Sequence, residues 1–159
     1  MMGRLMIAAL AATILTLSPI AFAQQGQSGT AQQARAMLDK AIAAVKADKA
    51  KAVEMFNKGD GGFRDRDLYV YCFNAGDGKV VATGNPNAKQ LIGQDERTLK
   101  DPTGKEFGKE SYAAAQKQEG VISEVTALFP RPGADTTPVT KTNFITRVGD
   151  LGCGVGYFK

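Results

Sequence analysis

The chain has 159 residues, a formal net charge of +4 and an ordinary globular composition, with 43% hydrophobic and 23% charged residues. It contains no His, no Trp and two cysteines, Cys72 and Cys153. The Ser-His-Asp and Cys-His nucleophile systems, the HExxH zinc helix, and zinc sites that use His or four thiolates are therefore excluded. We expect a single domain that is not an enzyme and carries no metal or other cofactor.

The first residues predict an export signal rather than part of the fold. An arginine precedes the apolar run from Leu5 to Leu17, and Ala21-Phe22-Ala23 supplies the small residues that a signal peptidase recognises. An uncleaved membrane anchor is the alternative, but Pro19 breaks the apolar run well short of the ~20 residues that span a bilayer. We expect cleavage of residues 1–23, a flexible leader at residues 24–30, and a soluble periplasmic protein.

The basic residues are scattered along the chain and interleaved with acids, as in Arg64-Asp65-Arg66-Asp67. A nucleic-acid surface needs basic residues clustered on one face, with aromatic residues between them. The pattern instead indicates a solvated surface of mixed charge, and we predict no nucleic-acid partner.

Residues 30–62 carry the pattern of one long helix followed by a short one. Thr30 and Gln33 have the spacing of a capping box at a helix N-terminus. Apolar residues then recur every three or four positions from Ala34 to Val45, which predicts one buried helix face. We expect a break near Asp48 and an end to the second helix at Gly59–Gly62.

From residue 68 the pattern changes to that of strands joined by hairpins. Residues 68–73 are rich in β-branched and aromatic side chains, and the turn residues 75–78 lead to a second arm at 79–83. The later predicted elements are a helix at 105–118 and strands at 121–129, 139–148 and 151–158. The pattern therefore predicts one α+β domain over residues 31–159, with antiparallel strands and helices packed outside them.

Several segments, taken in order, carry a family resemblance. They are Phe63–Tyr71 (FRDRDLYVY), Asn74–Val81 (NAGDGKVV), Asn85-Pro86, Leu91–Gly93, Lys100–Phe107 (KDPTGKEF), Lys141–Phe144 (KTNF), Arg147–Asp150 (RVGD) and Gly154–Lys159 (GVGYFK). This ordered set resembles the single Cache domain, the PAS-like extracellular sensor module of bacterial chemoreceptors and sensor kinases. The resemblance implies a long N-terminal helix against a five-stranded antiparallel sheet of order 2-1-5-4-3. It also implies a small-molecule pocket on the far face of that sheet.

The chain departs from the family in its length. Family sensors carry a transmembrane helix on each side and a cytoplasmic output domain, whereas this chain stops at Lys159, directly after the last predicted strand. The resemblance is therefore to a free-standing exported form. As partners we expect a small-molecule ligand and a membrane sensor kinase or chemoreceptor that receives the signal.

Strand parity places the candidate pocket residues, because successive side chains alternate between the two faces of a strand. On one face of the first strand lie Tyr69, Tyr71 and Phe73, and on one face of the last lie Gly152, Gly154 and Gly156. If these strands are neighbours, as the resemblance implies, the aromatic residues lie beside the glycines. Glycine inside a strand often marks the close approach of a ligand, which favours a cavity there. The alternative is that the rings cover bare glycine backbone as core packing.

Lys141 is the polar residue singled out for ligand binding. It matches the family's lysine in a K-x-x-Y stretch, where Phe144 replaces the usual Tyr, and Asn143 lies on the same face of the strand. A lysine near a pocket can pair with a carboxylate ligand. A solvated lysine at a sheet edge is the alternative.

A Cys72–Cys153 disulfide is the expectation for an exported chain of this family. Export places both thiols in an oxidising compartment, and both would lie on the same face of neighbouring strands. The alternative is a pair of buried free thiols, because cysteine also packs as a small hydrophobic residue.

Three enzymatic interpretations are weaker than their structural alternatives. Glu106 and Glu110 have the spacing of an exposed helix face, and Gly152-x-Gly154-x-Gly156 has no helix after it to bind a dinucleotide. Ser111 has no histidine to activate it.

The main hypothesis is therefore an exported sensor domain that binds a small carboxylate. The alternative is a structural or interaction module without a ligand, which acts through its helix.

Overall fold

The computed structural model describes residues 28–131 and 136–159, so the predicted export signal lies outside the described residues. Helix α1 (Ala31–Ala47) begins with the expected capping box: Thr30 accepts from the backbone of Gln33, and the Gln33 side chain accepts from the backbone of Thr30. Asp48 ends α1 and caps α2 (Lys49–Lys58), and α2 ends at Gly59 with φ 74°. The long helix and the short helix are confirmed.

The strands form one antiparallel sheet. They are β1 (Arg64–Asp65), β2 (Leu68–Asn74), β3 (Val80–Thr83), β4 (Ser123–Pro130), β5 (Pro138–Val148) and β6 (Leu151–Phe158). The path β1-β2-β6-β5-β4 runs across the sheet, and β3 pairs with β2. The α+β class is confirmed. The strand order differs in detail from the expectation, because the two-residue β1 also pairs with β2 and the sheet has six strands rather than five.

A connector between β3 and β4 holds the 3-10 helices η1 (Pro86–Leu91) and η2 (Glu96–Thr98) and the helix α3 (Phe107–Ala115). Helix α3 is shorter than predicted. The carboxylate of Asp101 accepts hydrogen bonds from the backbone of Thr103 and Lys105, so residues 101–105 form a turn before the helix begins. Asp101 also accepts from the backbone of Leu128, which fixes this turn to β4.

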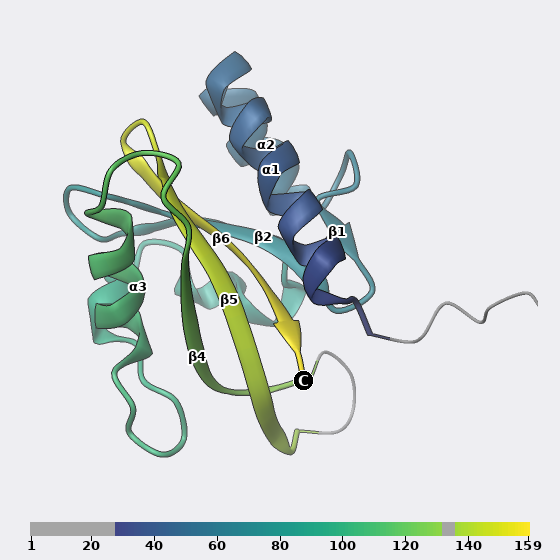
Figure 1. Cartoon of the computed structure of the whole chain (residues 1–159), viewed down its shortest axis with the longest axis vertical. Helices are drawn as coiled ribbons and strands as arrows, with labels where there is room; N and C mark the ends of the chain where they lie inside the picture. The colour runs from purple at the N-terminus through teal and green to yellow at the C-terminus, as the bar shows by residue number, and fades with distance from the viewer. Residues whose placement is uncertain (1–27, 132–135) are drawn as a thin grey trace, which may run out of the picture.

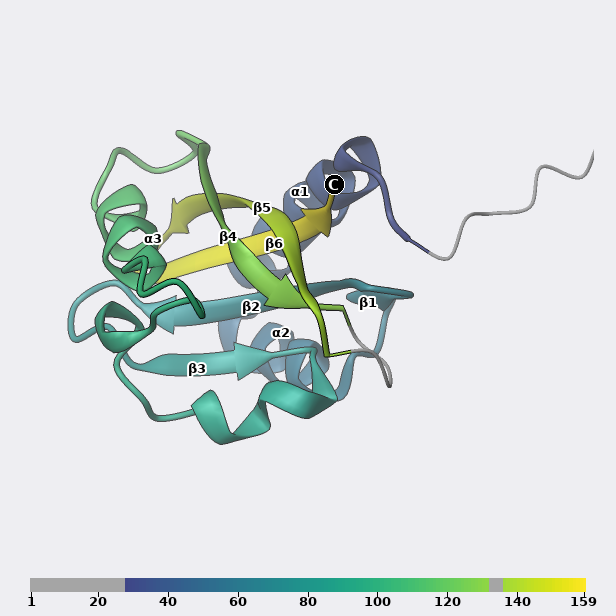
Figure 2. The same cartoon turned by 90° about the horizontal axis from the view of Figure 1, so that it is seen from below.

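The helices are divided between the two faces of the sheet (Figures 1 and 2). Helices α1 and α2 pack on one face through a cluster that includes Leu38, Phe56, Leu68, Val70, Leu151 and Val155. Helix α3 packs near one end of the other face through a second cluster that includes Phe73, Phe107, Ala114, Val125 and Ile145. The sheet therefore has one face covered by α1 and α2, and one face covered by α3 and the connector.

The predicted disulfide is present in the first cluster. Cys72 on β2 and Cys153 on β6 are direct partners across the two strands, with their Cα atoms 4.1 Å apart. Both cysteines are fully buried. The bond joins the two central strands on the face that α1 covers.

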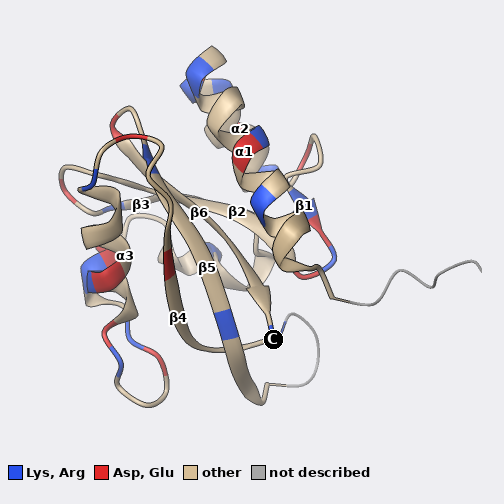
Figure 3. Cartoon of the chain, viewed as in Figure 1, with Lys and Arg blue, Asp and Glu red and all other residues tan. Residues whose placement is uncertain are grey.

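Charged residues are spread over the helices and loops of the described chain, with acidic and basic positions interspersed (Figure 3). Several form exposed ion pairs, such as Lys58 with Glu54 at 2.6 Å and Lys49 with Asp150 at 2.7 Å. This distribution agrees with the solvated mixed-charge surface that the sequence indicates.

Candidate functional site

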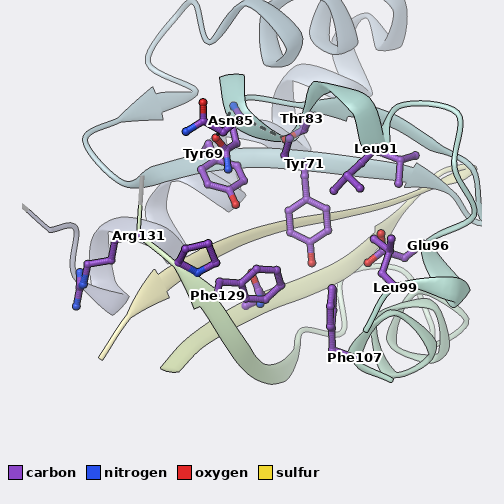
Figure 4. A pocket seen from close by; sticks show the side chains of 15 residues that line it. Tyr69, Tyr71, Thr83, Asn85, Leu91, Glu96, Leu99, Phe107, Phe129 and Arg131 are labelled. Carbon is purple, nitrogen blue, oxygen red and sulfur yellow. Dashed lines mark hydrogen bonds between the residues drawn. The ribbon is translucent and has the colours of Figure 1, made fainter. Parts of the chain in front are cut away.

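A pocket of ≈ 210 Å³ lies between the sheet and the connector, on the face opposite α1 (Figure 4). Strands β2 and β5 supply Tyr69, Tyr71 and Asn143 to its wall. The remaining lining residues come from β3, the connector, the start of α3 and the end of β4: Val80, Thr83, Asn85, Asn87, Ala88, Leu91, Glu96, Leu99, Phe107, Phe129, Pro130 and Arg131. The pocket is thus mainly apolar, with a few polar side chains, as is typical of small-molecule sites.

Strand parity predicted the sheet side of this pocket. Tyr71 lies opposite Gly154 and Phe73 opposite Gly152 across β2 and β6, and Asn143 lies opposite Gly156 across β5 and β6. The aromatic side chains therefore do lie beside the glycines. The three residues that strand parity brings to the pocket wall are Tyr69, Tyr71 and Asn143.

The glycines of β6 make room for side chains rather than for a ligand. A Cβ at Gly152 would lie 2.5 Å from the Phe73 ring, and one at Gly154 would lie 2.8 Å from the Tyr71 ring. Phe73 is fully buried in the second cluster. Neither Phe73 nor Gly154 lines the pocket, because the rings of Phe73 and Tyr71 cover the bare strand. For these two positions the structure favours the packing alternative.

Lys141 is buried behind the pocket wall rather than at its surface. Its side chain crosses Gly156, where a Cβ would lie 2.4 Å from Cε, and the residue is 2% exposed. Its Nζ donates to the hydroxyl of Tyr69 at 2.8 Å and lies 3.9 Å from the centre of that ring. The solvated-edge alternative is therefore wrong for Lys141, but the cation reaches the pocket only through Tyr69.

No carboxylate among the described residues forms an ion pair with Lys141. The ammonium group is instead surrounded by ring faces, with the centres of Phe158 and Phe129 at 5.0 and 5.6 Å from Nζ. Aromatic faces attract a cation, and the attraction grows when water is excluded. They do not remove its charge, so the ammonium group is left without an opposite charge among the described residues.

Glu96 is a pocket residue that sequence reasoning missed. The side chain is 2% exposed, and its Oε1 is buried without a hydrogen-bond partner in the described residues. Figure 4 shows the Glu96 carboxyl group directed toward the hydroxyl of Tyr71. Burial raises the pKa of Glu96 to about 7, with a smaller opposing effect of the Ser111 hydroxyl. Burial and the nearby Glu96 together raise the pKa of Tyr71 well above its usual value.

The backbone around Glu96 holds it firmly in place. Its amide donates to the carbonyl of Gly78 at 2.8 Å, and its carbonyl accepts from the amide of Leu99 at 3.0 Å. Helix α3 approaches so closely that a Cβ at Gly108 would lie 1.8 Å from the Glu96 carbonyl oxygen. Only glycine permits this contact between η2 and α3, so Gly108 fixes the position of Glu96. The closely packed glycine is the one sequence signal that could have drawn attention to this segment.

Arg131 lies at the other side of the pocket (Figure 4), and its guanidinium bonds to both ends of the described chain, Ser28 and the carbonyl of Lys159. Its guanidinium donates to Ser28 Oγ at 2.6 Å and to Asp67 Oδ2 at 3.2 Å, and it stacks 4.8 Å from the centre of the Phe158 ring. Since Asp67 is an ion-pair partner of Arg131, this cation is already neutralised in part.

Two features are absent from residues 28–131 and 136–159. These residues contain no cluster of three or more His, Cys, Asp or Glu side chains placed to hold a metal ion. They also contain no helix that is both long and apolar enough to cross a membrane.

Helices α1 and α2 on one face of an antiparallel sheet, with a pocket under a connector on the other face, are the architecture of a PAS-like domain. The family model "Single Cache domain 2" matches residues 16–157, and the chain belongs to this family. The resemblance noted from the sequence is thereby confirmed. A search of curated proteins gives no match.

Three solved structures of similar fold carry descriptions that name chemotaxis or chemosensing. One is described as the periplasmic sensor domain of a chemotaxis protein (TM-score 0.57, 22% identity, covering 80% of this chain and 88% of that one). A second is a methyl-accepting chemotaxis protein from Vibrio parahaemolyticus (TM-score 0.62, 18% identity, 80% and 86% covered). A third is a Cache chemosensory domain described in terms of carboxylic acid recognition (TM-score 0.56, 22% identity, 80% and 86% covered). At these identities the likeness is one of fold.

Proposed function

We propose that the protein is an exported, periplasmic, non-enzymatic sensor domain that binds a small carboxylate and signals through a membrane sensor kinase or chemoreceptor. The observation that carries the proposal is the buried Lys141, which has no acidic partner among the described residues and lies directly behind a pocket wall. A buried charge without an opposite charge is costly, and an anion in the pocket would lower that cost. The third structural neighbour, a Cache chemosensory domain described in terms of carboxylic acid recognition, supports the same class of ligand.

Tyr69 is the residue that transmits the charge of Lys141 to the pocket. Its oxygen accepts a hydrogen bond from the ammonium group, so its own proton remains to be donated elsewhere. Tyr69 lines the pocket, and Figure 4 shows its hydroxyl directed inward. A hydroxyl polarised by a neighbouring cation is a good donor to a carboxylate. The proposed anion site therefore consists of Tyr69, backed by Lys141, with Asn143 beside it.

The test is calorimetric titration of the mature protein with acetate and propionate, and with their neutral amides as matched controls. Lys141→Met should weaken carboxylate binding by about 1.5–3 kcal/mol, the scale of a hydrogen bond to a charged group. The variant Lys51→Met, which changes an exposed lysine of α2, serves as the control and should leave the affinity unchanged. Equal affinities for wild type and Lys141→Met would remove Lys141 from the site.

One observation favours the alternative of an interaction module without a ligand. Phe73, Tyr71 and Lys141 fill the space over the glycines of β6, where the sequence placed the ligand. The pocket is the space that remains beside them, under the connector. If no small metabolite raises the melting temperature of the wild-type protein, the interaction module becomes the better hypothesis, because a bound ligand stabilises the folded state.

A further inference from the structure

The pocket contains a second buried charged group, Glu96, whose role the carboxylate site does not explain. Its carboxyl group is 2% exposed, lines the pocket and points into it, and Oε1 has no hydrogen-bond partner among the described residues. An unsatisfied buried oxygen of this kind is uncommon in folded proteins, since it loses its bonds to water without replacing them. It therefore marks a place where a donor is expected.

None of the cations packed around η2 pairs with Glu96. Arg97 bonds to Asp95 at 2.6 Å and lies over the Tyr112 ring. The charged residues at the start of α3 pair among themselves, as Lys100–Glu106, Lys109–Glu106 and Lys105–Glu110. The other groups that act on Glu96 are Tyr71, Asp95 and Ser111. Beyond the larger effect of burial, the Ser111 hydroxyl, which donates to the carbonyl of Phe107, lowers the pKa of Glu96, and the charge of Asp95 raises it. The acid is thus left without a neutralising group from the described part of the chain.

The pocket therefore has two chemically opposite ends. At one end the Tyr69 hydroxyl is backed by the Lys141 ammonium, and at the other lies the Glu96 carboxyl group. Figure 4 shows Tyr71 between Tyr69 and Glu96, with the apolar side chains of Leu91, Leu99 and Phe107 on the Glu96 side. A ligand that spans the pocket would meet a positive group, then a hydrocarbon wall, then an acceptor.

We propose that Glu96 is a second recognition residue of the pocket and selects small carboxylates that also carry a hydroxyl or ammonium group. That group donates its hydrogen to Oε1 of Glu96. The inference rests on the proposed function, because the other end of the same ligand occupies the Tyr69–Lys141 site. It also specifies what the pocket rejects. A dicarboxylate would bring a second negative charge against Glu96, and a plain fatty acid would leave Oε1 without a donor.

The protonation of Glu96 distinguishes the two kinds of donor. With a pKa of about 7 the carboxyl group is ionised above neutrality and protonated below it. An ammonium group binds the ionised form, so its affinity should rise as the pH is raised from 6 to 8. A hydroxyl group can donate to either form, so its affinity should depend less on pH. Plain carboxylates, which gain nothing from ionised Glu96, should bind no better at pH 8 than at pH 6.

The experiment compares propionate and butyrate with their terminally hydroxylated and terminally aminated analogues by calorimetric titration at pH 6 and pH 8. In the wild type the preferred substituted acid should bind at least about tenfold more tightly than the plain acid of equal length. In the isosteric variant Glu96→Gln, which carries no charge, the preference for the aminated acid over the plain acid of equal length should disappear. The pH series on the wild type tests the same point without a variant.

The outcomes separate this inference from the proposed function. If plain acids bind as tightly as the substituted ones in the wild type, or if Glu96→Gln weakens both equally, the role of Glu96 is refuted and the carboxylate site stands. If succinate binds more tightly than either substituted acid, the inference is also wrong. If no acid of the series binds, the proposed function fails together with the inference.

Discussion

The two faces of the sheet are built from the same strands and differ in almost every physical respect. On the face that α1 covers, Leu68, Val70 and Cys72 alternate along β2 and pack, fully buried, against α1 and α2. On the other face the intervening residues Tyr69 and Tyr71 border a pocket. One face is apolar and cross-linked, and the other holds buried groups of both charges.

Under the proposed function, this difference assigns stability to one face of the sheet and ligand binding to the other. The burial of apolar side chains and the disulfide favour the folded state on the α1 face. Buried polar groups on the pocket face, Lys141 and Glu96 above all, oppose folding unless a partner satisfies them. We therefore expect changes on the α1 face to alter stability and leave binding intact, and changes on the pocket face to alter both.

The largest effect is expected from removing the disulfide. Cys72 and Cys153 are 81 residues apart in the sequence, and the chain-entropy model assigns such a cross-link about 4.5 kcal/mol of stabilisation. The double variant Cys72→Ala/Cys153→Ala should lose about that amount of unfolding free energy in urea titrations. Because the bond lies on the α1 face, the affinity for the best carboxylate should stay within about twofold.

Thiol counting on denatured, unreduced wild-type protein provides the control for this experiment, and it should find no free thiol among these two residues. A loss of affinity as large as the loss of stability would contradict the independence of the two faces. A loss of stability well below 1 kcal/mol would show that the cross-link contributes little to the folded state.

The sequence predicts the α1 face better than the pocket face, for a physical reason. Helix and strand periodicity report which side chains are buried, so the capping box at Thr30, the break at Asp48 and the pairing of Cys72 with Cys153 were all predictable. The two-residue β1 has no periodicity and was missed. The fold class followed from the order of the elements and from the family resemblance.

The pocket was predictable only on its sheet side. Parity predicted that Tyr69, Tyr71 and Asn143 share this side of the sheet, and all three line the pocket, because their orientation follows from the strands. Their role in ligand binding stays a prediction. Parity gives the direction of a side chain but not how far it extends. It therefore could not decide whether the Phe73 ring covers Gly152 or leaves a cavity there. Glu96 lies in an irregular polar segment that resembles an exposed loop, and its burial depends on the long-range contact of η2 with Gly108.

The second-largest effect concerns the pH dependence of stability on the pocket face. The pKa of Glu96 is raised from 4.5 to about 7 on folding, so the folded state holds this proton more tightly than the unfolded chain. The contribution of Glu96 to the unfolding free energy is therefore fully present below pH 4.5, and it is lost as the pH rises through 7. The unfolding free energy of Glu96→Gln relative to wild type should therefore increase by about 3 kcal/mol across this range.

The matched control is Glu54→Gln on α2, on the other side of the sheet. Lys58 lowers the pKa of Glu54 through a hydrogen bond, so this acid contributes stability at higher pH that is lost on acidification. The difference between variant and wild type should thus change in the opposite direction, and weakly, because the pair is exposed. A Glu96→Gln difference that is independent of pH would mean that Glu96 is not buried as described.

The smallest of these effects is expected from the hydroxyl of Tyr69. Tyr69→Phe keeps the ring that lies 3.9 Å from Lys141 Nζ and removes the group that accepts its hydrogen bond. Loss of a hydrogen bond to a buried cation should lower the unfolding free energy by about 2 kcal/mol. In a Lys141→Met background the same change should have little effect, because no cation is left unsatisfied. The double-mutant cycle therefore isolates the Lys141–Tyr69 pair. An equal loss in both backgrounds would show that Tyr69 acts alone, and the charge of Lys141 would then have no route to the pocket.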